Sequence, residues 1–202
     1  MRVGLYFGTF NPIHVGHLVI ANYMAEYTDL DEVWLVISPH NPHKEKKTLL
    51  EDYHRLAMVN IAVEGNSKLK ASDIEFSLPK PSYTATTLAY LKGKYPEKEF
   101  ALMMGEDNLR SFHKWFNYEA ILAQHKIYVY PRVMTIQEEA KAEPLIVKSE
   151  ILNHENITFC AEVPVMKVSS SFIRKAIAQK KDVSYLLTEK VYEYLDEMNF
   201  YK

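Results

Sequence analysis

The stretch VGLYFGTFNPIHVGH, at positions 3–17, decides the fold expected for this chain. Its first residues, Val3–Phe7, form an apolar run that predicts a buried strand. The glycine and proline that follow predict a turn, and the pattern over Val15–Tyr27 predicts a helix. A short apolar strand that leads through a tight turn into a helix is typical of a βαβ unit.

The same alternation continues along the chain. We expect further strands at Glu32–Ser38, Lys70–Phe76, Glu99–Met104, Lys126–Tyr130 and Ile157–Ala161, and helices at Leu50–Val63, Thr84–Lys94, Tyr118–Ala123, Ser170–Lys180 and Glu189–Met198. Most of these strands are apolar on both faces, which indicates a parallel sheet covered by helices on both sides. The sequence therefore predicts an α/β fold: one domain over residues 1–202, with a doubly wound parallel sheet and a small C-terminal helical part. In such sheets, ligands bind beyond the carboxyl ends of the strands.

The composition disfavours several classes of protein. The 202 residues include 24 Lys and Arg against 26 Asp and Glu, and this net charge of −2 argues against a nucleic-acid or membrane-surface binder. The single cysteine, Cys160, excludes an internal disulfide and a Cys-rich zinc module. The apolar runs are far shorter than the roughly 20 residues that span a bilayer, and the first residues lack the pattern of a signal peptide. We expect a cytoplasmic protein with small-molecule partners.

Residues 8–17 combine glycine, proline and histidine at a predicted helix start. Gly8 lets a ligand approach the backbone, and the N-terminus of a helix attracts phosphate through its N–H groups and partial positive charge. His14 and His17 are three positions apart, so their imidazoles face one side and could donate to phosphate oxygens. With His40 and His43 the pair could instead form a metal site, but no carboxylate or cysteine pattern completes one.

A second polar cluster precedes the predicted helix at Ser170–Lys180. The hydroxyls of Ser169, Ser170 and Ser171 can cap that helix and donate to an anion, and Arg174 can form a forked contact with phosphate. Serine runs also cap many helices that bind no ligand. The second cluster therefore supports phosphate binding only in combination with the first. From the residues alone, the two clusters indicate helix starts that are suited to bind phosphate.

At these residues the chain resembles the HxGH nucleotidyltransferases, which have a Rossmann-like fold and join a nucleoside monophosphate to a phosphate acceptor. Residues 8–17 are similar to the family pattern G-x-F-x-P-x-H-x-G-H, and residues 168–174 to its second signature, I-S-S-T-x-I-R, with Ser171 in place of Thr. The resemblance implies catalytic roles, without a covalent intermediate, for His14, His17 and Arg174. It also implies ATP-binding residues, namely Gly8, Thr9, Phe10, Ser169, Ser170 and Ser171.

Other segments resemble the nicotinate-nucleotide adenylyltransferase branch of this family. Residues 42–44 are similar to its P-P-H-K/R loop, which implies a catalytic role for Lys44, although an ordinary solvated run of charges would look the same. Residues 81–88 resemble its P-S-Y-T-x-D-T-L element, with Thr86 in place of Asp, and residues 105–115 resemble its glycine–aspartate–tryptophan stretch. The branch also usually has Asp at the position of Asn11. The resemblance implies further binding residues: Tyr83, Thr84 and Trp115 for the acceptor, and Gly105, Asp107 and Arg132 for ATP.

The reaction that the resemblance implies joins ATP and nicotinate mononucleotide into nicotinate adenine dinucleotide, with release of pyrophosphate. Mg²⁺ would accompany ATP, and no residue is expected to bind a metal of its own. Several alternatives stay open: an enzyme for nicotinamide mononucleotide or for both acceptors, a cytidylyltransferase, and a nucleotide-binding regulator without turnover. A pantetheine-phosphate adenylyltransferase normally has Thr at the position of His14. The sequence is also compatible with a homo-oligomer.

Overall fold

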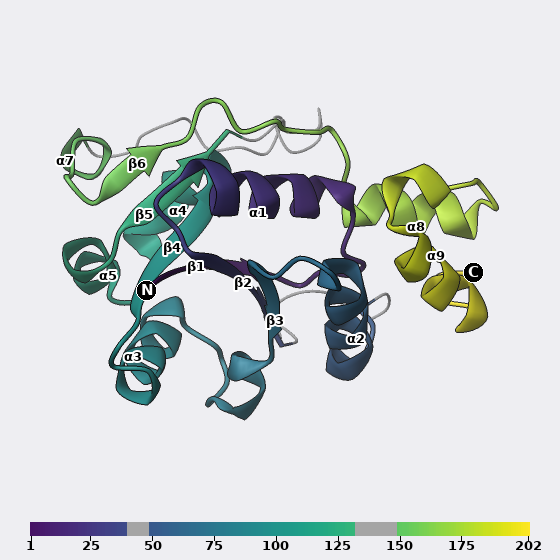
Figure 1. The fold of residues 1–202 in the computed structure, drawn as a ribbon, viewed down its shortest axis with the longest axis horizontal. Helices are drawn as coiled ribbons and strands as arrows, with labels where there is room; N and C mark the ends of the chain where they lie inside the picture. Colours follow the sequence, from purple (N-terminus) through teal and green to yellow (C-terminus); the bar gives the residue numbers. More distant parts are fainter. Residues whose placement is uncertain (40–48, 132–148) are drawn as a thin grey trace.

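A computed structural model describes residues 1–39, 49–131 and 149–202. These residues contain a six-stranded sheet in the order β3-β2-β1-β4-β5-β6, with all neighbouring strands parallel (Figure 1). The strands are β1 Arg2–Gly8, β2 Glu32–Ile37, β3 Leu69–Ser72, β4 Glu99–Gly105, β5 Ile127–Tyr130 and β6 Ile157–Phe159. The predicted doubly wound parallel sheet is confirmed.

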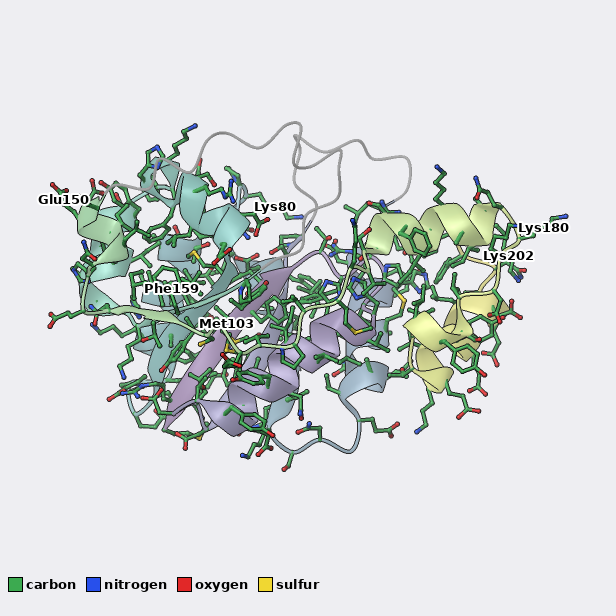
Figure 2. The ribbon with its side chains drawn as sticks, turned by 90° about the horizontal axis from the view of Figure 1, so that it is seen from above. Lys80, Met103, Glu150, Phe159, Lys180 and Lys202 are labelled. Carbon is green, nitrogen blue, oxygen red and sulfur yellow. The ribbon has the colours of Figure 1, made fainter. Side chains whose placement is uncertain are left out.

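Both faces of the sheet are buried, because successive side chains of a strand point to opposite sides. In β4, Phe100 and Met104 belong to one hydrophobic cluster, and Ala101 and Met103 belong to the other. Figure 2 shows Met103 inside the molecule, and its side chain is buried. This packing explains why the strands read as continuous apolar runs rather than as alternating ones.

Helices cover each face of the sheet. The cluster that contains Met103 also includes side chains of α1 (Val15–Tyr27) and α2 (Asp52–Val63). The opposite cluster includes side chains of α3 (Thr84–Lys94), α4 (Glu106–Ser111) and α5 (Tyr118–Gln124). The remaining short elements are the 3₁₀ turns η2 Ile74–Ser77, η3 Phe112–Lys114 and η4 Ser184–Leu186 and the single helical turn α7 Ser149–Leu152.

The last two helices form the C-terminal part that the sequence predicts. These are α8 (Ser170–Ala178) and α9 (Glu189–Glu197), which lie together at one side of the molecule (Figure 1). Figure 2 shows Lys180 and Lys202 at this end and Glu150 at the opposite end. Apolar residues of both helices, including Ile173 and Leu195, continue the cluster under α1 and α2. The C-terminal part therefore shares a core with the sheet.

The order in which strands are added to the sheet reverses between β1 and β4, which are parallel neighbours. From β1 the sheet grows through β2 to β3 on one side, and the chain then returns to add β4, β5 and β6 on the other. At such a point the loops after two adjacent strands diverge and leave a crevice where ligands bind. Here those loops follow Gly8 and Gly105, the last residues of β1 and β4.

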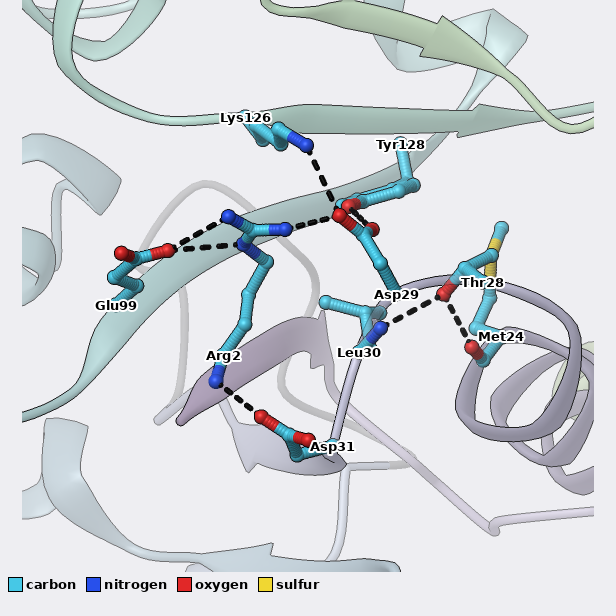
Figure 3. A network of polar contacts seen from close by, with 9 residues as sticks. All are labelled: Arg2, Met24, Thr28, Asp29, Leu30, Asp31, Glu99, Lys126 and Tyr128. Carbon is cyan, nitrogen blue, oxygen red and sulfur yellow. Dashed lines mark hydrogen bonds and ion pairs between the residues drawn. The ribbon is translucent and has the colours of Figure 1, made fainter.

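A polar network joins the amino ends of the strands, which lie at the opposite side of the sheet from the crevice (Figure 3). The carboxylate of Asp29, in the turn between α1 and β2, accepts hydrogen bonds from Arg2, Lys126 and Tyr128, and Arg2 also pairs with Glu99. Burial opposes ionisation of Asp29, but these hydrogen bonds and the charge of Arg2 hold its pKa below the usual range. The network ties the starts of β1, β4 and β5 together, away from the crevice.

Two predicted elements differ in the structure. The strand expected at Lys70–Phe76 runs from Leu69 to Ser72, and Ile74–Ser77 forms a 3₁₀ turn, in which the buried carboxyl group of Glu75 accepts a hydrogen bond from Thr87 of α3. The helix α4 was not predicted, since its residues, EDNLRS, are mostly polar and too few to show a helical period. The strand expected at Ile157–Ala161 ends at Phe159.

Candidate active site

The loop between β1 and α1 is held by its own apolar side chain. Phe10 has a left-handed backbone, with φ of +45°, which is uncommon for a bulky residue. Its ring is buried and packs edge-on against Tyr6, at 5.8 Å between ring centres, and against His17, at 5.1 Å. A Cβ atom on Gly8 would lie only 2.8 Å from this ring. Phe10 thus shapes the loop from the core side, and Gly8 makes room for its ring.

The two histidines of the first motif stack on each other at the start of α1. Their ring centres are 3.7 Å apart, with 22° between the ring planes. The residue His14 is only 5% exposed to solvent. His14 N–H donates to Nδ1 of His17 at 3.3 Å, so a neutral His17 carries its proton on Nε2. This pairing fixes the tautomer of His17 and makes Nε2–H the group that can donate to an anion.

The second motif meets the first, although they are at opposite ends of the chain. Ser170 Oγ donates to the carbonyl oxygen of Pro12 at 2.8 Å across 158 positions, and Arg174 Nη1 donates to the carbonyl oxygen of Asn11 at 2.7 Å. Arg174 Nη2 also donates to Ser171 Oγ at 3.2 Å. The structure therefore brings the start of α8 to the loop that enters α1.

Close packing explains the glycine between the two histidines. A Cβ atom on Gly16 would lie 2.7 Å from Cγ1 of Val168, which precedes α8. Ser169 caps α8, since its hydroxyl accepts the N–H of Phe172 at 3.2 Å. The N-termini of α1 and α8 thus lie side by side, and each has a partial positive charge. With Arg174 they form a cationic region that suits a polyphosphate.

A fully buried arginine supports this region, and the sequence did not indicate it. Arg55 in α2 is 0% exposed and donates to three carbonyl oxygens: Thr9 at 2.7 Å, Ser38 at 2.8 Å and Leu50 at 3.1 Å. Its guanidinium also pairs with Asp52. An arginine in an amphipathic helix is usually exposed, so only the three-dimensional structure identifies Arg55 as the link between the loops after β1 and β2.

The predicted acceptor residues lie at the start of α3. Tyr83 is the N-cap residue of this helix and Thr84 its first residue. The exposed rings of Tyr83 and Phe116 pack with centres 4.9 Å apart, and Phe116 was not predicted as part of a site. Trp115 packs edge-on against Phe112, at 5.5 Å, and is half-buried. Aromatic side chains therefore gather where the N–H groups of α3 begin.

A buried carboxyl group connects this segment to the phosphate-facing loop. Glu75 in η2 is buried and accepts a hydrogen bond from Thr87 Oγ1 at 2.8 Å, and Thr87 Oγ1 also lies 3.3 Å from the carbonyl oxygen of Tyr83. Burial raises the pKa of Glu75, although hydrogen bonds with Thr87 and Ser38 oppose the shift. Ser38 N–H in turn donates to the carbonyl oxygen of Gly8 at 2.9 Å. Sequence reasoning missed Glu75, since nothing in its pattern distinguished it from a surface acid.

The other predicted residues are placed as follows. Gly105 ends β4 next to β1, and a Cβ atom there would lie 2.5 Å from Asp107 Oδ1, so Asp107 folds back over the strand end. Lys44, Arg132, His40 and His43 lie outside the described residues. In the described ranges, no three His, Cys, Asp or Glu side chains come together as metal ligands, and no helix is long and apolar enough to cross a membrane.

Comparisons with known proteins identify the family and the fold of this chain. The family model described as cytidylyltransferase-like matches residues 5–176. A solved structure of nicotinic acid mononucleotide adenylyltransferase from Plasmodium falciparum, in complex with NaAD, shares the fold with a TM-score of 0.75 at 20% identity, over 99% of this chain and 97% of that one. This chain belongs to the cytidylyltransferase-like family, whose fold is the α/β nucleotidyltransferase fold.

Relatives with more than 50% sequence identity identify the branch of the family to which this chain belongs. A protein of Christiangramia forsetii is 56% identical over 100% of this chain and 98% of its own length, and one of Flavobacterium psychrophilum is 55% identical over 100% of both. Both are named "probable nicotinate-nucleotide adenylyltransferase". Within the wider family, the chain is a member of the nicotinate-nucleotide adenylyltransferases, which are enzymes. The resemblance stated from the motifs is confirmed.

Proposed function

We propose that this chain transfers the adenylyl group of ATP to nicotinate mononucleotide, which yields nicotinate adenine dinucleotide and pyrophosphate in NAD biosynthesis. One observation carries the proposal: the starts of α1 and α8 are joined by the Ser170–Pro12 and Arg174–Asn11 hydrogen bonds. Two helix N-termini, two imidazoles and a guanidinium thus lie together beyond the carboxyl end of β1. This arrangement suits a triphosphate, in a family whose members are named for this reaction.

The reaction needs no nucleophile from the protein. An oxygen of the acceptor's phosphate attacks the α-phosphorus of ATP in line and forms the new P–O bond, while the bond to the bridging oxygen breaks and pyrophosphate leaves with the electron pair. Negative charge develops on the transferred and leaving phosphates, so catalysis is positioning and charge stabilisation. His17 and His14 would donate to these oxygens, and Arg174 with Ser169–Ser171 would hold the leaving pyrophosphate. Lys44 would guide the acceptor phosphate.

The acceptor is proposed to bind at the start of α3. Backbone N–H groups at Tyr83 and Thr84 would donate to the carboxylate of nicotinate, which the start of a helix favours. The half-buried Trp115 would stack on the pyridine ring, and stacking on a cationic ring contributes about 1–2 kcal/mol. Gly8, Thr9, Phe10, Gly105, Asp107 and Arg132 would surround ATP.

Nucleotidyltransferases that use ATP generally require a divalent metal, and we propose that here it is Mg²⁺, which enters as part of the substrate. The groups that the structure gathers are imidazole, guanidinium and hydroxyl, and the described residues contain no three-ligand protein cage. Imidazole and guanidinium groups are poor ligands for Mg²⁺, so the ion would be held by the phosphate oxygens of ATP and by water, the usual state of Mg²⁺ bound with nucleotides.

Pyrophosphate release tests the proposal. The protein is incubated with Mg²⁺–ATP and, in parallel, with nicotinate mononucleotide or nicotinamide mononucleotide. We expect strong release with the acid and little with the amide, because the N–H groups of α3 favour a carboxylate. Equal rates would keep the chemistry and refute acid selectivity. Binding of ATP without release with either acceptor would favour the nucleotide-binding regulator.

Four further properties are proposals. We propose that residues 1–202 act as a single nucleotidyltransferase domain, that the protein is cytoplasmic and that its partners are small molecules, with self-association into a homo-oligomer as a further expectation. Sedimentation at assay concentration would measure the oligomeric state, and fractionation of cells would locate the protein.

A further inference from the structure

Tyr201, close to the end of the sequence, reaches the loop that precedes α1. Its hydroxyl donates to Asn11 Oδ1 at 2.6 Å across 190 positions. The Asn11 residue is only 3% exposed, and its Oδ1 also accepts the N–H of Leu50 at 3.2 Å. One amide oxygen thus joins three segments of the chain.

Asn11 also binds Arg174 through its backbone. The guanidinium of Arg174 donates to the carbonyl oxygen of Asn11, and Ser170 donates to the next carbonyl oxygen, that of Pro12. A shift of Asn11 would therefore move the groups that are proposed to hold the pyrophosphate. Asn11 stands where the family usually has Asp, so this contact joins a tyrosine to a neutral amide.

Neighbouring contacts hold Tyr201 in this place. Phe200 packs edge-on against His54 of α2, with ring centres 4.7 Å apart, and His54 Nδ1 lies 2.8 Å from the hydroxyl of Tyr194 in α9. Tyr201 itself has a left-handed backbone, with φ of +64°, which is uncommon for a bulky residue. Burial raises the pKa of Tyr201, against the opposing charges of Arg174 and Arg55, so its hydroxyl keeps the proton and donates throughout the neutral range.

We propose that Tyr201 is a positioning residue of the ATP site, acting through Asn11 to fix the loop on which Arg174 and Ser170 rest. The proposal deepens the adenylyltransferase function and rests on it. Tyr201 touches no reacting atom in this scheme. Its effect falls on the binding of the triphosphate and leaves acceptor binding at the start of α3 unchanged.

The test compares Tyr201→Phe with Tyr185→Phe as the matched control. Tyr185 is also in the C-terminal part, but it is 93% exposed. Loss of a hydrogen bond of this kind corresponds to about a 3- to 10-fold change in an equilibrium constant, so Tyr201→Phe should raise the KM for ATP about 3- to 10-fold. The KM for nicotinate mononucleotide and the kinetics of Tyr185→Phe should stay unchanged. An unchanged KM for ATP in folded Tyr201→Phe, even with a lower Tm, would overturn the proposal.

A double-mutant cycle tests the route through Asn11. In an Asn11→Ala background, Tyr201→Phe should have no further effect on the KM for ATP, because the acceptor of its hydrogen bond is gone. Equal effects of Tyr201→Phe in both backgrounds would refute the route.

Direct measurement of the Kd for Mg²⁺–ATP by calorimetry separates this proposal from the proposed function. If the wild-type protein binds ATP but releases no pyrophosphate, the proposed function fails. The Kd values of Tyr201→Phe and the wild type then still decide the role of Tyr201. Absence of ATP binding by the wild type would refute both.

Discussion

Replacement of Arg55 by methionine tests how the loops after β1 and β2 are held. Methionine has a similar length and can fill the same buried space, but it leaves the carbonyl oxygens of Thr9, Ser38 and Leu50 without the guanidinium and leaves Asp52 without its ion pair. Hydrogen bonds to charged groups contribute about 1.5–3 kcal/mol each, and loss of the ion pair adds at most about 1 kcal/mol, because Asp52 is partly exposed.

We expect Arg55→Met to lower the free energy of unfolding by about 3–5 kcal/mol, because water and backbone movement recover part of the lost hydrogen bonding. For a chain of this size, each kcal/mol corresponds to about 2–4 °C, so the melting temperature should fall by roughly 6–20 °C. Urea unfolding at neutral pH measures the loss. Arg55→Lys is the matched control: its single ammonium keeps the charge but cannot serve all three carbonyls, so its loss should be intermediate. A loss under about 1 kcal/mol for the methionine variant would refute the buried clamp.

Two further predictions concern the histidine pair and the network at the amino ends of the strands. His17→Ala should lower turnover by about 10²–10³-fold, as removal of a transition-state donor does, with little change in acceptor affinity; steady-state rates within threefold of the wild type would contradict this role. Asp29→Asn should destabilise the protein by about 1 kcal/mol at pH 7, because half-exposed ion pairs contribute little more. Since the pKa of Asp29 is lowered on folding, its stabilisation is complete above the unfolded value of about 3.9 and is lost at lower pH. The difference in urea midpoint between variant and wild type should therefore shrink as the pH falls below about 4, and a difference independent of pH would be the opposing result.

The sheet could be predicted because most of its strands are short, continuous runs of apolar residues. In β4, every residue from Phe100 to Gly105 is apolar, and all six are buried in the structure. The short elements carry no such signal. The polar helix α4 begins directly after Gly105, the last residue of a buried strand, and its few residues are too short a stretch to show a helical period.

The site could be predicted in part. His14, His17, Ser170 and Arg174 stand in motifs whose spacing is distinctive, and the structure brings them together. The residues that hold them in place, such as Arg55 and Tyr201, have no local pattern. A buried polar side chain is defined by distant partners, here carbonyl oxygens and an amide, so the sequence alone does not distinguish it from a surface residue.

The most direct test of the central claim follows the α-phosphorus. The protein is incubated with nicotinate mononucleotide, Mg²⁺ and ATP that is radiolabelled at the α-phosphorus, and the products and the protein are separated. Direct in-line attack by the acceptor predicts that the label appears in nicotinate adenine dinucleotide in step with pyrophosphate release, and that none remains bound to the protein. Label in free AMP, label bound to the protein, or no labelled dinucleotide would contradict the account.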